Sequence, residues 1–172
     1  MNDISFVKLN DSRYSDSVKR LWKDIFGDDY DFIDRFYSVF PMEKVAFIAV
    51  FFGEVVGIVN SLDVRASYRD ALYEGRYIYA LALRQDLRGR GYAKKLLSMA
   101  EGRDFTLLVP EKEELFEMYR HIGYVFETEI DARFEEPHLF FTEGGDIPCG
   151  EKVRALFKSD LKIPEDAVFS LI

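Results

Sequence analysis

The sequence has few residues of the types that build disulfide frameworks and metal centres. Its 172 residues include one cysteine, Cys149, which excludes an intrachain disulfide and favours a reducing compartment. The two histidines, His121 and His138, lie far from that cysteine in the sequence, and no metal-ligand spacing occurs. Cys149 also lacks the histidine and acid or amide partners that activate a nucleophile. We expect no metal site and a structural or incidental thiol.

Positive charge and long apolar runs are also scarce. The 23 basic residues are outnumbered by 31 acidic ones, which gives a net charge of −8 and a pI near 4.9. Nucleic-acid binding depends on neutralising phosphates with lysine and arginine, so no nucleic-acid partner is expected. No apolar run could cross a bilayer, and residues 1–10 lack the apolar core of a signal peptide. We expect a cytoplasmic protein with no membrane partner.

What the chain does contain is enough apolar side chain for one well-buried core. Hydrophobic residues make up 48% of the sequence, and 172 residues is short for two ordinary domains. Gly144 and Gly145 mark a joint near the C-terminal end. We therefore expect one domain over residues 1–143, with residues 144–172 as a helical extension packed on it.

Hydrophobic periodicity predicts a mixture of helices and strands. Runs rich in β-branched and aromatic residues predict strands at 6–9, 45–51, 55–64, 77–83, 105–109, 124–134 and 138–142. Apolar residues at helical spacing predict helices at 15–26, 31–39, 92–99, 113–122 and 151–161. Residues 65–76 are expected to be less regular. Together these segments predict a mixed sheet with helices on both faces.

The most informative motif is RGRGYA, from Arg88 to Ala93, which follows a predicted strand and begins a predicted helix. Gly89 and Gly91 have no Cβ, so the backbone can adopt unusual φ and ψ values and approach a ligand closely. The first N–H groups of a helix lack intrahelical partners and favour an anion. By itself the motif is either a phosphate-binding loop or a glycine-rich turn with solvated arginines.

A second motif follows one strand and one helix later. Tyr119, Gly123 and Tyr124 form a tyrosine, three residues, glycine and an aromatic, after the predicted strand FTLLVP. The segment Arg88–Ala93 fits the pattern of Gln or Arg, two residues, Gly, one residue, then Gly or Ala. This order of motifs resembles the GNAT superfamily, the acetyl-CoA-dependent N-acyltransferases. The resemblance covers roughly residues 1–142.

The resemblance implies an α/β (α+β) fold with a mixed, largely antiparallel central sheet of about six or seven strands, flanked by helices on both faces. It also implies an N-acetyltransferase that transfers the acetyl group of acetyl-CoA to a primary amine by direct attack in a ternary complex. Lys112 and Leu115 stand where the family often has Asn and Ala. These departures leave open a noncatalytic acyl-CoA-binding sensor or interaction module. A nucleotide loop of another type is disfavoured, since GxxxxGK[ST] and GxGxxG are absent.

The resemblance also assigns cofactor contacts. The coenzyme A pyrophosphate of the family lies on the loop amides, and the pantetheine arm pairs with the end of the preceding strand. A backbone N–H on that strand polarises the acetyl carbonyl as negative charge develops. The residues implied here are Leu81, Ala82, Leu83, Arg88, Gly89, Arg90, Gly91, Tyr92 and Ala93.

Tyr119 is the residue to which the resemblance assigns chemistry. In the family, this tyrosine lies near the coenzyme sulfur and assists departure of the thiolate. A phenol with a pKa of about 10 is a weaker acid than a thiol of about 8.5, so hydrogen bonding is as plausible as proton transfer. A packing role is also open, because Leu115, Tyr119 and Ile122 form an apolar stripe at helical spacing.

The general base is less specified. An amine with a lysine-like pKa of about 10.4 must lose a proton before it attacks. Several relatives carry a glutamate at the position of Tyr77. The candidate carboxylates here are Glu74 and Asp63, and a water chain to solvent is an equal alternative.

Two further features concern partners. An acidic cluster is either a surface for a cationic amine or a solvated helix face; it comprises Asp24, Asp28, Asp29, Asp31 and Asp34. The aromatic fraction of 16% and the apolar C-terminal residues fit either a homodimer surface or a tail folded on a monomer.

Overall fold

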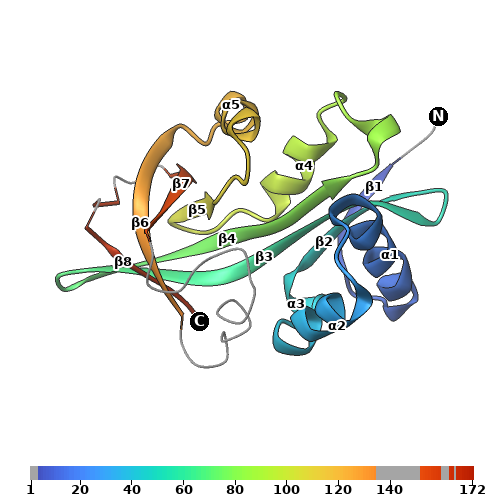
Figure 1. Cartoon of the computed structure of the whole chain (residues 1–172), viewed down its shortest axis with the longest axis horizontal. Helices are drawn as coiled ribbons and strands as arrows, with labels where there is room; N and C mark the ends of the chain where they lie inside the picture. Colours follow the sequence, from blue (N-terminus) through green and yellow to red (C-terminus); the bar gives the residue numbers. More distant parts are fainter. Residues whose placement is uncertain (1–3, 135–151, 160–162, 165) are drawn as a thin grey trace. The chain divides into compact units, whose positions relative to one another are not determined.

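The computed structural model describes residues 4–134, 152–159, 163–164 and 166–172 (Figure 1). Eight strands in these residues pair in the order β1-β2-β3-β4-β5-β7-β6-β8. The β4–β5 and β6–β8 pairs are parallel, and the other pairs with a defined register are antiparallel. This mixed, largely antiparallel sheet with flanking helices confirms the predicted fold class, with eight strands instead of six or seven.

The elements have the following bounds. The strands are β1 (Ser5–Lys8), β2 (Ala46–Phe51), β3 (Glu54–Tyr68), β4 (Ala71–Leu83), β5 (Phe105–Leu108), β6 (Phe126–Phe134), β7 (Lys152–Lys158) and β8 (Val168–Leu171). The helices are α1 (Ser15–Phe26), α2 (Tyr30–Val39), α3 (Met42–Val45), α4 (Tyr92–Met99) and α5 (Glu113–His121), with short 3₁₀ turns at Ser12–Tyr14 and Gln85–Leu87.

The chain divides into two compact units. The first comprises Met1–Ser61 and Tyr79–Ala100, and the second comprises Leu62–Ile78 and Glu101–Ile172. Strands β3 and β4 contribute residues to both units. The glycine-rich loop therefore belongs to the first unit, and Tyr119 belongs to the second.

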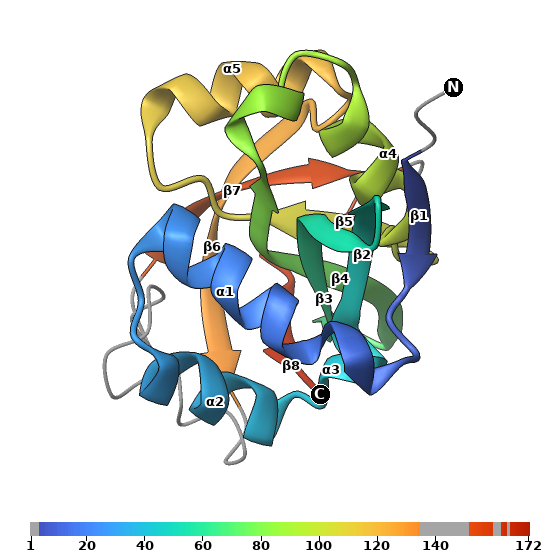
Figure 2. The same cartoon turned by 90° about the vertical axis from the view of Figure 1, so that its right-hand side faces the viewer.

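In the first unit, helices cover both faces of the antiparallel β1-β2-β3 sheet. Successive side chains of a strand point to opposite faces, so neighbouring residues of β3 identify the helix on each face. Tyr37 of α2 donates a hydrogen bond to the Asn60 side chain (3.1 Å). Ser61 donates instead to the carbonyl of Ala100, just after α4 (2.8 Å). Helices α2 and α4 thus lie on opposite faces, as Figure 1 and Figure 2 show.

Local sequence sets the limits of α1 and α2. Gly27 ends α1 with a φ of 83°, and its N–H closes a hydrogen bond to the preceding turn. The carboxylate of Asp29 accepts a hydrogen bond from the N–H of Phe32 (2.8 Å) and caps α2. Trp22 of α1 and Phe36 of α2 are both buried, with their ring centroids 5.0 Å apart. Burial of these rings holds the two helices together.

In the second unit, the strands close into a ring. Their order is β3-β4-β5-β7-β6-β8, and β8 pairs again with β3. Phe105 of β5, Phe157 of β7 and Phe169 of β8 pack on one another, with ring centroids 5.4 to 6.1 Å apart. Strand β8 is not a neighbour of β5 or β7 in this order, so the three side chains meet inside the ring of strands. Closure pairs β8 on both sides, with β6 and with β3.

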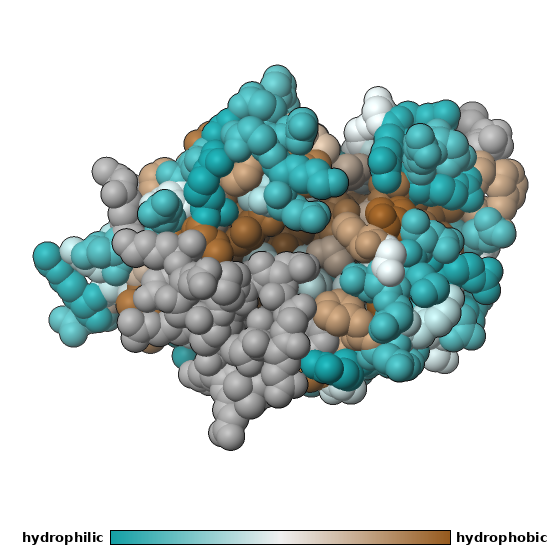
Figure 3. Space-filling model, viewed as in Figure 1, coloured by the Kyte–Doolittle hydropathy of each residue, from teal (hydrophilic) through white to brown (hydrophobic). Residues whose placement is uncertain are grey.

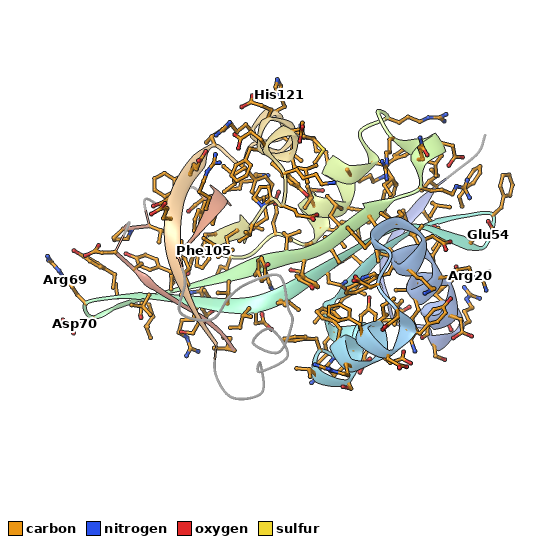
Figure 4. All side chains as sticks on the ribbon, in the orientation of Figure 1. Arg20, Glu54, Arg69, Asp70, Phe105 and His121 are labelled. Atoms are coloured by element: carbon orange, nitrogen blue, oxygen red, sulfur yellow. The ribbon has the colours of Figure 1, made fainter. Side chains whose placement is uncertain are left out.

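Gly75 of β4 makes room for one of these rings. A Cβ added at Gly75 would lie 2.5 Å from a ring carbon of Phe105. Phe105 is paired with Gly75 across β4 and β5, and it is almost fully buried (Figure 4). A larger residue at position 75 must therefore displace the phenylalanine.

Two predictions about elements are wrong. Residues 65–76 are not irregular: they continue β3 to Tyr68 and begin β4 at Ala71, with Arg69 and Asp70 at the tip of the hairpin (Figure 4). Residues 152–158 form β7 and not a helix, because β5 and β6 hydrogen-bond to this segment from its two sides. The C-terminal extension is therefore not helical in its described residues. The predicted strand 138–142, His138, Cys149, and the glycines at 144 and 145 lie outside the described residues.

The surface of the described residues is mainly hydrophilic in the view of Figure 3, in keeping with the 31% of charged residues. No helix in this part of the chain is long and apolar enough to cross a membrane.

Candidate active site

The predicted phosphate-binding loop has the backbone conformation that only glycine adopts easily. In the first unit, Gly89 has a φ of 75° and Gly91 a φ of 79°, both in the left-handed region. A Cβ added at either glycine would meet no atom within 4 Å. The positive φ, and not a lack of space for a side chain, therefore explains why glycine stands at both positions. The open space beside the loop leaves its backbone accessible to a ligand.

Helix α4 begins directly at this loop. Gly91 is its N-cap and has no side chain to cap the first amides, and Lys95 N–H makes a helical hydrogen bond back to the Gly91 carbonyl (3.1 Å). The N–H of Arg88 donates to the carbonyl of Gln85 (3.2 Å), whereas the first N–H groups of α4 have no intrahelical acceptor and are available to an anion, which the helix dipole favours. Residues 88–91 are exposed, and Tyr92 and Ala93 are half-buried. The loop can therefore bind a phosphate group through main-chain N–H groups.

Arg88 connects the loop to the end of β4. Its Nε donates a hydrogen bond to the carbonyl of Leu83 (3.0 Å). The same strand end is fixed to β3, because Arg84 N–H donates to the carbonyl of Val56 (2.8 Å). Arg88 thus has a structural contact besides its charge. The loop and the predicted pantetheine-binding strand end belong to one hydrogen-bonded substructure.

Strand β4 bends just before that strand end. Ala80 has a φ of 54°, a left-handed conformation that costs an L-residue roughly 1–2 kcal/mol. After it, Leu81 is half-buried, and Ala82 and Leu83 are buried. This strained residue lies directly before the strand end, Leu81–Leu83, to which the resemblance assigns the pantetheine arm.

In the second unit, Tyr119 lies on the buried face of α5. Its side chain is 8% exposed, and Phe116 from the preceding turn is buried on the same face. Burial raises the pKa of Tyr119 to about 12. The phenol therefore keeps its proton at neutral pH and is a hydrogen-bond donor. The Tyr119 ring can therefore pack in the interior of the second unit while its protonated hydroxyl remains able to donate a hydrogen bond.

The two candidate bases are both exposed and ion-paired. Asp63 lies 2.8 Å from a guanidinium nitrogen of Arg76, and Glu74 lies 2.9 Å from one of Arg103. More than half of each carboxylate side chain is solvent-exposed. Both pairs belong to the second unit. These positions suit surface ion pairs, so the structure adds no feature that favours either carboxylate as a base.

His121 lies at the end of α5 and points away from the sheet (Figure 4). Its Nδ1 is 2.7 Å from the carbonyl of Glu117, one turn earlier in the helix. Among the described residues, no group of three or more metal-ligating side chains comes together. His121 is accordingly a surface residue of the helix.

Comparison with known families decides the identity of this fold. The model of the acetyltransferase (GNAT) family matches residues 10–109, more than half of the chain. The chain belongs to the GNAT family. A search of curated proteins finds no similar sequence. The match includes the glycine-rich loop and β5, whereas α5 and the strands after it extend beyond it.

Solved structures of other GNAT proteins share the fold. YhbS from Escherichia coli, in complex with CoA, aligns with a TM-score of 0.63 at 12% identity over 100% of this chain and 91% of that chain. Diaminobutyrate acetyltransferase EctA from Paenibacillus lautus, in complex with L-2,4-diaminobutyric acid and coenzyme A, aligns with a TM-score of 0.54 at 15% identity over 95% of this chain and 100% of that chain. A GCN5-related N-acetyltransferase from Kribbella flavida has a TM-score of 0.59 at 19% identity over 74% of this chain. Our chain spans 33% of the length of that protein.

Sequence reasoning missed two features of this GNAT site. The left-handed Ala80 carries no signal, because alanine gives no hint of a positive φ. The Arg88 contact to Leu83 was also missed, because a motif arginine beside glycines suggests a ligand contact first. Both depend on the path of β4 in the folded chain.

Proposed function

We propose that this GNAT protein is an N-acetyltransferase that transfers the acetyl group of acetyl-CoA to a primary amine of a small molecule or peptide. The observation that carries the proposal is the Arg88–Ala93 loop, with its two left-handed glycines at an uncapped helix start and open space beside them. Family membership supports the same donor. The amine attacks the thioester directly in a ternary complex, and no metal is needed.

The donor side of the reaction rests on backbone groups. The amides from Arg88 to Ala93 bind the pyrophosphate, and the arginine side chains add positive charge. The pantetheine arm pairs with backbone groups of Leu81, Ala82 and Leu83, where the strain at Ala80 supports a departure from regular pairing. One N–H there stabilises the charge that develops on the acetyl oxygen.

Tyr119 assists departure of the coenzyme A thiolate by hydrogen bonding to the sulfur. Its burial and its protonated phenol support this role. The amine loses its proton to a water chain, or to Glu74 or Asp63 after the carboxylate leaves its arginine partner. The water chain needs no such rearrangement.

The proposed acceptor is a primary amine, which carries a positive charge until it loses its proton. The acidic side chains at the α1–α2 junction, Asp28 and Asp29, support this choice only in part, because Asp28 accepts a hydrogen bond from Trp22 and Asp29 caps α2. EctA, which shares the fold, is named for an amine with two amino groups. Diaminobutyric acid is therefore a rational first acceptor to test. The proposed setting is the cytoplasm, with a monomer or homodimer that binds neither nucleic acid nor membrane.

A second function is a noncatalytic module of the same fold that binds acyl-CoA. The ion pairs of both candidate bases favour it, since neither carboxylate is poised to accept a proton. Such a module binds acyl-CoA through the same loop and the same end of β4, but it transfers no acyl group.

Thermal denaturation with acetyl-CoA, coenzyme A or ATP tests the donor. Both coenzymes are expected to raise the melting temperature and ATP is not, because selective binding to the folded state stabilises it. No shift with either coenzyme would contradict the proposal. Release of free thiol from acetyl-CoA over a panel of primary amines, with diaminobutyric acid included, then separates the enzyme from the binding module.

A further inference from the structure

The hydroxyl of Tyr124 is buried without a hydrogen-bond partner in the part of the chain that the structure describes. Tyr124 is 1% exposed and lies in the second unit, three residues after the end of α5. A buried hydroxyl that makes no hydrogen bond costs roughly 1–3 kcal/mol. A phenylalanine would fill the same space without that cost. The hydroxyl therefore calls for a role other than packing.

The chain turn after α5 places Tyr124 against Tyr119. Gly123 has a φ of 108°, which favours glycine, and Tyr124 N–H donates to the Tyr119 carbonyl (3.1 Å). The two rings meet edge to face, with centroids 6.0 Å apart and planes 70° apart. Two phenols thus lie side by side in a buried site on one helix and its following turn.

Burial and nearby negative charge keep the Tyr124 hydroxyl protonated. Burial is the largest cause that raises the pKa of Tyr124, and the negative charges of Glu101 and of an ionised Tyr119 raise it further. Glu101 itself is ion-paired with Lys158 of β7. Both phenols therefore stay protonated in the folded protein, so both can donate hydrogen bonds.

We propose that Tyr124 is a positioning residue for Tyr119: its hydroxyl, which makes no hydrogen bond in the described residues, donates one through a single water to the Tyr119 oxygen when negative charge grows there during the reaction. This inference rests on the role proposed above for Tyr119. As the sulfur–acetyl bond breaks, the electron pair stays on sulfur, and the Tyr119 proton is drawn toward that thiolate. Negative charge then grows on the Tyr119 oxygen, where the Tyr124 donor stabilises it. Each proton stays bonded to its own tyrosine, and each hydrogen bond strengthens the next.

The Tyr124→Phe variant tests this role, because activity and stability should move in opposite directions. We expect kcat for thiol release, with the most active amine of the panel, to fall roughly tenfold, the effect of one hydrogen bond to a charged group. The KM for acetyl-CoA should stay within twofold, and the melting temperature should stay the same or rise. A kcat within twofold of the wild type would overturn the proposal.

A double-mutant cycle with Tyr119→Phe shows whether Tyr124 acts through Tyr119. In the Tyr119→Phe background, adding Tyr124→Phe is expected to cause no further loss of kcat. An equal loss in both backgrounds would overturn the inference while leaving the role of Tyr119 intact. If Tyr119→Phe alone leaves kcat unchanged, the proposed role of Tyr119 itself fails, which is a separate result.

The matched control is Tyr37→Phe in the first unit. The Tyr37 hydroxyl does have a partner, the side chain of Asn60 at 3.1 Å. Its removal is expected to lower the melting temperature, in contrast to Tyr124→Phe. The control shows that the measurement detects the loss of a partnered buried hydroxyl.

Discussion

At the scale of single residues, burial decides what Tyr119 can contribute. With its pKa raised to about 12, Tyr119 is a weaker acid than a thiol of about 8.5 by more than three pKa units. Complete transfer of its proton to a coenzyme A thiolate is then uphill by on the order of 5 kcal/mol. A hydrogen bond that stabilises the developing thiolate has no such cost. The sequence left these two roles open, and burial favours the hydrogen bond.

The Tyr119→Phe variant should accordingly lose turnover and keep its cofactor. We expect kcat to fall roughly 10- to 100-fold, because one hydrogen bond to a developing charge is lost. Affinity for acetyl-CoA, measured by calorimetry, should remain within about twofold, since the phenylalanine ring still fills the buried space beside Tyr124. An unchanged kcat would remove Tyr119 from the mechanism.

Gly91 offers a second prediction at this scale. In Gly91→Ala the new methyl group meets nothing, yet the φ of 79° costs an alanine roughly 1–2 kcal/mol. We expect either lower stability or a relaxed loop, and in both cases weaker binding of coenzyme A by calorimetry. Ala93→Gly, in the first turn of α4, leaves the left-handed turn at Gly91 unchanged and serves as the control. Wild-type affinity in Gly91→Ala would show that the left-handed turn is not needed for binding.

The conformation of the predicted loop could be derived from the sequence where the backbone requires a particular residue type. The glycines at 89 and 91 are such positions, because the turn needs positive φ. The motif predicted the chemical role of Tyr119, and helical spacing predicted its burial, which the structure confirms. The bend at Ala80 and the lone hydroxyl of Tyr124 could not be predicted, since both follow from tertiary packing around ordinary residues.

At the scale of elements, the ring of strands in the second unit depends on one close approach. Gly75→Ala would place a methyl group 2.5 Å from the Phe105 ring. We expect a loss of roughly 1–3 kcal/mol in the free energy of unfolding, the usual effect of overpacking. Denaturant unfolding measures it.

The double variant Gly75→Ala/Phe105→Leu provides the control for this contact. The smaller leucine should recover part of the stability lost in Gly75→Ala, because the two sites are in contact. Strictly additive losses would show that the crowding at Phe105 is not the cause.

Arg154 of β7 attaches α5 to the strands through charge. Its guanidinium donates to Glu113 of α5 (2.9 Å) and to Glu127 of β6 (2.7 Å), and lies 4.0 Å from the centroid of the Phe116 ring. These hydrogen bonds hold the pKa of both glutamates below the usual value. A folded-state pKa below the unfolded one stabilises the protein above the unfolded pKa of 4.5, and that stabilisation is lost as the pH falls through the folded value.

Arg154→Met should therefore lower the melting temperature at pH 7 by a small amount, because the pairs are exposed and solvent screens them. The difference from the wild type is expected to shrink as the pH falls below 4.5 and through the lower folded-state pKa values of the two glutamates, because they are then protonated in both states. Methionine keeps much of the packing on Phe116. Melting curves between pH 3 and 7 check this, with Arg13→Met as an exposed ion-pair control. A difference that is constant over this range would exclude the charge-based explanation.

Most helices and strands could be predicted because their apolar residues recur with either the helical period or the strand period, and not with both. Helix α4, predicted over residues 92–99, is confirmed over the same residues. The segment of β7 fits two periods: Val153, Leu156 and Phe157 have helical spacing, whereas Val153, Ala155 and Phe157 alternate. Pairing with β5 and β6 decides in favour of the strand. Such long-range pairing is not visible in a local pattern.

At the scale of the whole molecule, the net charge favours some classes of ligand over others, and GNAT family membership supports acetyl-CoA as the donor. An acidic protein with a local basic loop is suited to one anionic ligand and not to a polyanion. Saturating coenzyme A should therefore shift the melting of the whole protein. At about 100 times the dissociation constant, the expected gain is roughly 2.7 kcal/mol, or about 5 to 11 °C for a protein of this size.

This prediction is checked by a melting series at rising coenzyme A concentration. The shift should grow with the logarithm of the ligand concentration above the dissociation constant. High salt should reduce it, since part of the binding is between phosphate and arginine. A shift independent of ligand concentration would indicate an unspecific effect.

The central proposal is that the Arg88–Ala93 loop binds the pyrophosphate of coenzyme A and that Tyr119 donates a hydrogen bond to its sulfur. A crystal structure with coenzyme A bound tests it most directly. We predict that the pyrophosphate oxygens accept hydrogen bonds from the amides of residues 88–93, and that the Tyr119 hydroxyl lies within hydrogen-bonding distance of the sulfur. A pyrophosphate bound away from this loop, or a sulfur out of reach of Tyr119, would contradict the account.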